Sequence, residues 1–104
     1  MTDLLSYAAD WVDESRAALG DRGVEFGLSR SPADRENPSL WIDVDGSDRM
    51  VRVTLWASGE AVLAAADGTT GSILLEEQLT LADTAAVEET LRRAVTLASG
   101  GSPS

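Results

Sequence analysis

The side chains in this sequence that could do chemistry are almost all carboxylates. The chain has no His, Cys or Lys, and its 18 Asp and Glu residues face only eight cationic residues, all of them Arg. His, Cys and Lys supply the usual general bases, nucleophiles and Schiff-base amines, so a Ser nucleophile would lack a base. Transition metals would likewise lose their preferred ligands. We therefore expect no enzyme, no metal site and no cofactor.

The densest carboxylate cluster is the segment 43–48, which begins Asp-Val-Asp-Gly. An EF-hand calcium loop needs oxygen ligands at its first, third and fifth positions and Glu at its twelfth. Counted from Asp43, the fifth and twelfth positions are Ser47 and Thr54, so the calcium pattern fails. A strand that alternates inward and outward residues and then turns explains the segment better.

One catalytic alternative uses carboxylates alone. Paired acids such as Asp43, Asp45 and Glu76 could in principle hydrolyse a glycoside, if a concave site gathered them. Such a site is usually a deep cleft, which a small single-layer sheet rarely forms. A flat surface would exclude this hypothesis.

Two segments have the apolar spacing of amphipathic helices. The first spans residues 3–19, with Thr2 or Asp3 as its cap and Gly20 and Gly23 as its stop. The second begins near Thr80, where Thr-Leu-Ala-Asp is similar to a capping box. Acid-first pairs four residues apart are expected on its outer face, Glu88 with Arg92 and Glu89 with Arg93. The apolar stripes are Leu4, Ala8, Trp11, Val12, Ser15 and Leu19 in the first helix, and Val87, Leu91, Ala94, Val95 and Ala98 in the second.

Between the helices, alternating apolar and polar residues predict five strands. Val24, Phe26 and Leu28 define the first strand, and a Pro-containing loop over residues 30–39 follows it. The later strands are separated by turns at 45–48, 57–59 and 67–71. Such short turns require antiparallel neighbours, because parallel pairing needs a long crossover.

The order of elements predicts the fold class. We expect an α+β domain, an antiparallel five-stranded β-meander with N-terminal and C-terminal helices packed on one face (α-β5-α). Residues 1–98 would form this single α+β domain, and residues 99–104, Ser-Gly-Gly-Ser-Pro-Ser, a flexible C-terminal tail.

The formal net charge of −10 constrains the partners. It disfavours nucleic acid and anionic membranes, because both are bound largely through Lys and Arg. A basic protein is the natural complement, although acidity can also serve solubility alone. No apolar stretch approaches the roughly 20 residues that cross a bilayer, and the chain opens without a basic signal region. We therefore expect a cytoplasmic protein.

The predicted alternation leaves one sheet face open. If Leu40, Ile42 and Val44 point to the core, the residues between them point outward, and Arg52 and Trp56 follow on the next strand. Aromatic residues and Arg are enriched at binding hot spots. In the alternative interpretations the register is inverted, or the Trp residues only stack on each other or on Arg52. The predicted partner-binding residues are Trp41, Asp43, Asp45, Arg52, Thr54, Trp56 and Glu76.

The segment 55–61, Leu-Trp-Ala-Ser-Gly-Glu-Ala, resembles the TriTu family of small bacterial immunity proteins. The resemblance continues through the turn at 67–71, the segment 74–77 and residues 79–80, and so covers the C-terminal half. It rests mainly on the Trp-x-Ser-Gly-Glu hairpin. It implies a non-enzymatic inhibitor that binds a cognate toxin, with no contact residues to transfer.

Two binding functions follow as hypotheses. The first is a small acidic immunity protein that inhibits a cognate, basic toxin. The second is an adaptor or chaperone-like subunit, for instance of a secretion apparatus, that binds a partner or forms a homodimer through the open sheet face. Dimerisation through Trp41 and Trp56 would favour the second hypothesis.

Overall fold

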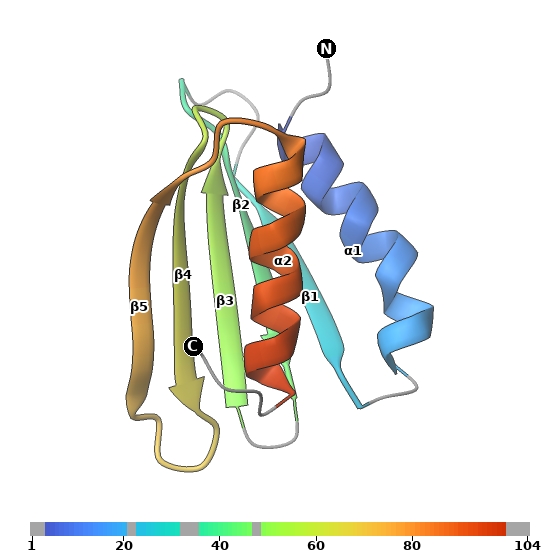
Figure 1. Ribbon diagram of the computed structural model, residues 1–104, viewed down its shortest axis with the longest axis vertical. Helices are drawn as coiled ribbons and strands as arrows, with labels where there is room; N and C mark the ends of the chain where they lie inside the picture. Colours follow the sequence, from blue (N-terminus) through green and yellow to red (C-terminus); the bar gives the residue numbers. More distant parts are fainter. Residues whose placement is uncertain (1–3, 21–22, 32–35, 47–48, 100–104) are drawn as a thin grey trace.

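The computed structural model describes residues 4–20, 23–31, 36–46 and 49–99. All neighbouring strands of the sheet are antiparallel and follow the order β1-β2-β3-β4-β5, as Figure 1 shows. The predicted α+β meander with terminal helices is therefore confirmed. The elements are α1 (Leu4–Gly20), β1 (Glu25–Arg30), β2 (Ser39–Asp45), β3 (Arg49–Trp56), β4 (Glu60–Asp67), β5 (Ile73–Thr80) and α2 (Thr84–Ala98).

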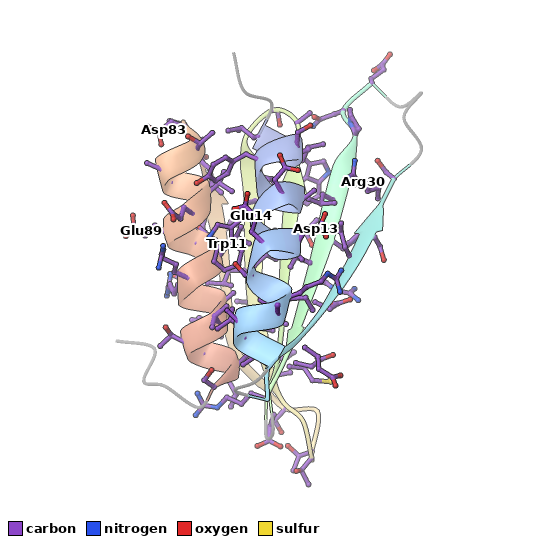
Figure 2. The ribbon with its side chains drawn as sticks, turned by 90° about the vertical axis from the view of Figure 1, so that its right-hand side faces the viewer. Trp11, Asp13, Glu14, Arg30, Asp83 and Glu89 are labelled. Atoms are coloured by element: carbon purple, nitrogen blue, oxygen red, sulfur yellow. The ribbon has the colours of Figure 1, made fainter. Side chains whose placement is uncertain are left out.

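Both helices lie on the same side of the sheet (Figures 1 and 2). The helix α2 packs over β2, β3 and β4, while α1 packs on β1 and against α2. Neither of these two helices is long and apolar enough to cross a membrane. The strand β5 lies at one edge of the sheet, and the helices leave it largely exposed.

The core lies between the helices and the inward residues of the sheet. Alternation places every second residue of β2 and β3 inward, so these side chains are at most 1% exposed. Full burial of one such aliphatic side chain stabilises the fold by roughly 1.5–3 kcal/mol. From α2, five residues that share one face of the helix complete this core. The core includes Leu40, Ile42, Val44, Val51, Val53, Leu55 and Leu63 from the sheet, Val12 from α1, and Val87, Leu91, Ala94, Leu97 and Ala98 from α2.

Two glycine turns lie against the ends of the segment 81–98, which contains α2 and is called the α2 segment below. In the β3–β4 turn, Gly59 has φ +98° and its carbonyl accepts a hydrogen bond from the Leu81 N–H at 2.7 Å. A Cβ at Gly59 would lie 2.6 Å from the Leu81 carbonyl oxygen. In the β2–β3 turn, a Cβ at Gly46 would overlap the Ala98 carbonyl group. These two contacts fix how closely the α2 segment approaches the sheet.

The helix α1 ends as the sequence predicts. Gly23 has φ +80°, its N–H donates to the Gly20 carbonyl, and the Val24 N–H donates to the Leu19 carbonyl. Trp11 packs edge-to-face on Phe26, with ring centroids 6.1 Å apart, but is half-buried and not a full core residue. The proposed caps at residues 2–3 and the tail residues 100–104 lie outside the described residues.

The predicted start of the second helix is wrong. Thr80 is the last residue of β5, and α2 begins at Thr84. Asp83 is the N-cap, because its Oδ1 accepts a hydrogen bond from the Ala86 N–H at 2.9 Å. The capping-box pattern at Thr80 was outweighed by strand pairing, since Thr80 lies opposite Glu60 in the sheet.

Only one of the two predicted ion pairs on α2 forms. Arg92 and Glu88 pair at 2.8 Å, as the spacing predicts. Arg93 is half-buried and pairs with Glu77 of β5, not with Glu89. Glu77 lies on the covered side of the sheet, so a partner from another element was available to Arg93. The expectation that Arg93 faces outward with Glu89 is therefore wrong.

We predict that Gly59→Ala lowers the free energy of unfolding by about 1–3 kcal/mol, because a positive φ disfavours a side chain and the Leu81 carbonyl blocks its Cβ. The matched control is Gly20→Ala, since a Cβ at Gly20 meets nothing within 4 Å. Urea denaturation of both variants measures the effect. Equal stability of the two variants would contradict this account of the turn.

Candidate protein-binding face

The strands carry a face without helices, which we call the open face and define as their side chains opposite the core. Strand register aligns these side chains in rows. One row runs from Asp43 through Arg52 and Ala64 to Glu76. All seven residues predicted to bind a partner lie on this face: Trp41, Asp43 and Asp45 on β2, Arg52, Thr54 and Trp56 on β3, and Glu76 on β5.

At the centre of the open face, Asp43 and Arg52 form an ion pair across β2 and β3. Arg52 Nε donates to Asp43 Oδ1 at 2.7 Å, and Arg52 Nη2 to Oδ2 at 3.3 Å. The hydrogen bond and charge of Asp43 raise the pKa of the Arg52 guanidinium above its ordinary value. The side chains remain 57% and 37% exposed for Arg52 and Asp43, so the pair is open to a partner.

Trp41 and Trp56 contribute the aromatic surface of the open face. Trp41 lies opposite Thr54, and Trp56 lies opposite Ser39 in the next outward row of the same two strands, so the two Trp residues are diagonal neighbours. Both side chains are half-buried, and within the described part of the chain neither ring stacks on another ring or on Arg52. The alternative that the two Trp residues only stack on each other or on Arg52 is therefore wrong.

The three carboxylates proposed for catalysis do not gather in one site, because Glu76 is remote from Asp43 and Asp45 on β2. Between Asp43 on β2 and Glu76 on β5 lie β3 and β4, so three strand spacings separate them, roughly 14 Å. Asp43 is already held by Arg52. Across the described residues there is no cluster of three or more acidic side chains that could hold a metal ion.

Two shallow hollows lie on the open face. The lower hollow, of about 340 Å³, is lined among others by Met50, Ala64, Ala66 and Ile73. The upper hollow, of about 490 Å³, lies beside Trp56 and includes side chains of β4 and β5. Both are concave enough for side chains of a partner and are far from the deep cleft of a glycosidase.

Sequence reasoning missed the contribution of β4 to the open face. Its outward residues include Val62, Ala64 and Ala66, which face out while Leu63 and Ala65 face the core. The run Ala64-Ala65-Ala66 has no contrast between its two faces, so periodicity could not orient it. Glu60 could have oriented this strand, because a charged residue at its start is expected to face solvent. Every second residue after it then also faces outward.

The charge of the open face has one dominant sign. Among the described strand residues it carries five carboxylates and only Arg52 as a cation. Because Arg52 is paired with Asp43, no second cation of the described strand residues on this face is left for the other acids. The five are Glu25, Asp43, Asp45, Glu60 and Glu76.

The helix-covered side of the protein also carries many acidic residues, but its charged side chains are distributed differently. Figure 2 shows Trp11 and Glu14 where the two helices meet, with Glu89 on the outer flank of α2. Three of the described arginines lie on the helices, Arg16, Arg92 and Arg93, and each is paired with a carboxylate. The exposed large hydrophobic side chains of the described residues, Met50, Ile73 and Leu74, all lie on strands.

These features define a small acidic α+β protein whose helices cover one face of the sheet and leave the other face open. The model of the family Immunity protein TriTu matches residues 6–96, and the chain belongs to this family. The match extends through α1 and β1, well beyond the C-terminal half that carries the resemblance in the sequence. No curated protein matches the chain.

The two sides of β3 predict opposite costs of substitution. We expect Arg52→Gln to lower the free energy of unfolding by less than about 1 kcal/mol, because exposed ion pairs contribute little to stability. Leu55→Ala on the covered side should cost about 2–5 kcal/mol, because Leu55 is only 1% exposed. Chemical denaturation compares them. A larger cost for Arg52→Gln would make the pair structural and not available for binding.

Proposed function

We propose that this immunity protein inhibits a cognate toxin by binding a basic surface of that toxin to its open face. The family assigns an immunity-protein role, and the geometry supplies a surface for it. The observation that supports the open face most is its composition, five carboxylates and one Arg around two half-buried Trp side chains. The inhibitor acts by occupancy and needs no catalytic group of its own.

In this proposal the carboxylates set the rate of encounter with the toxin, and burial of the Trp side chains sets the affinity. The carboxylates steer a basic partner to the face and speed encounter, an effect that salt weakens. Trp41 and Trp56 supply affinity, because large amphipathic rings at an interface gain the most from losing water. A toxin whose substrate is anionic has a basic groove, and an acidic sheet laid over that groove excludes the substrate.

The alternative of an adaptor that dimerises through the open face has less support. Two copies would bring like-charged faces together, and close like charges at an interface cost several kcal/mol. The net charge of −10 on each chain adds longer-range repulsion.

The test uses two charge-reversal variants of equal net charge, Asp45→Arg on the open face and Glu89→Arg on the outer flank of α2. Tagged wild type first captures the partner from its host at low salt, and the partner is then produced alone and with each variant. We expect the partner to arrest growth, and wild type and Glu89→Arg to restore it. Asp45→Arg should bind at least about tenfold more weakly.

A captured partner that is harmless to cells would contradict the immunity function itself. If Asp45→Arg restores growth and Glu89→Arg does not, the binding surface lies on the helices instead. Raising the salt concentration should weaken the wild-type complex, because its encounter is electrostatically steered.

A further inference from the structure

The lower hollow of the open face has a specific origin in the register of three strands. Ala64 lies opposite Arg52 on one side and Glu76 on the other, and Ala66 lies opposite Met50 and Ile73. Small methyl groups on β4 therefore stand between long side chains on β3 and β5. The β-bulge between Ala65 and Ala66 falls at this same place in the sheet.

The walls of the hollow are apolar, and contact of apolar side chains with water is unfavourable. Within the described residues the exposed large hydrophobic side chains are Met50, Ile73 and Leu74, with exposures of 51%, 66% and 50%. Met50 and Ile73 line the hollow, and Leu74 follows Ile73 on β5. Exposed apolar side chains gathered at one place on a small protein mark an interaction site.

The rim of the hollow is anionic. Asp43 and Asp45 both border it, together with Arg52. The Asp43 carboxylate is paired with Arg52, whereas the side chain of Asp45 has no hydrogen bond or ion pair with another residue that the structure describes. A group that enters the hollow therefore meets an apolar floor and an uncompensated carboxylate at the edge.

We propose that the lower hollow receives one long cationic side chain, arginine or lysine, of the toxin. Its methylene stem lies on Ala64 and Ala66 between Met50 and Ile73, and its charged head reaches Asp45. Such side chains bury their stems against apolar surface while the charge stays at the rim. This assignment rests on the proposed function and adds the chemistry of its central contact.

The other occupants fit less well. An aliphatic side chain would cover the floor but take water from Asp45 without giving it a partner. An acidic side chain would be repelled by the two aspartates. A second copy of this chain would place another acidic face against the rim.

The first experiment needs no toxin. Methyl resonances of Met50, Ala64, Ala66 and Ile73 are followed by NMR while N-acetyl-arginine methylamide is added, and the neutral isostere N-acetyl-citrulline methylamide is the control. We expect the arginine probe to shift these four methyl groups together, and Asp45→Asn to reduce its binding to that of citrulline. Equal shifts with both probes, or shifts elsewhere on the protein only, would overturn the proposal.

The second experiment uses the captured toxin and two alanine-to-methionine substitutions. Ala64→Met fills the hollow, whereas Ala85→Met adds the same bulk at an exposed position of α2, on the other side of the sheet. Thermal unfolding confirms that each variant is folded. We expect Ala64→Met to weaken toxin binding at least about tenfold and Ala85→Met to leave it within about threefold.

The outcomes separate this proposal from the function on which it rests. If both variants bind the toxin like wild type, the hollow is not the anchor, while the inhibitor function stands. If the arginine probe binds the hollow but no toxin is captured, the immunity function on this face fails.

Discussion

The close seating of α2 on the sheet is the constraint on which the rest of the structure depends. At one end of the helix segment Gly59 lies against Leu81, and at the other Gly46 lies against Ala98, each without room for a Cβ. Arg49 adds a hydrogen bond from its guanidinium to the Leu97 carbonyl, where the helix dipole favours a positive charge. Between these points, the apolar stripe of α2 closes the core over β2, β3 and β4.

That seating decides which side of the sheet is left for a partner. The Trp-x-Ser-Gly-Glu hairpin contributes residues both to the helix-covered side of the sheet and to the open face. Gly59 lies against Leu81, just before α2, and the Ser58 N–H donates to Asn37 Oδ1 at 3.1 Å, which links the turn to the loop before β2. Trp56 and Glu60 border the upper hollow of the open face. A motif that is short in sequence thus joins the fold to the surface proposed for binding.

The sequence predicts the fold where its two faces differ in polarity. In β2 and β3, Leu, Ile and Val alternate with Trp, Asp and Arg, so the register and the open face follow from period two. In β4 the three consecutive alanines remove that contrast, and the lower hollow could not be foreseen. The cap at Asp83 and the pairing of Arg93 with Glu77 depend on neighbours from other elements, which local spacing does not specify.

The most direct measurement follows the three Trp residues in the complex. Labelling with 5-fluorotryptophan gives ¹⁹F signals for Trp41 and Trp56 on the open face and for Trp11 between the helices, while an unlabelled toxin stays silent. We expect toxin binding to shift the signals of Trp41 and Trp56 and to leave that of Trp11 unchanged. A shift of Trp11 alone would show that the partner binds the helix side and would contradict the account.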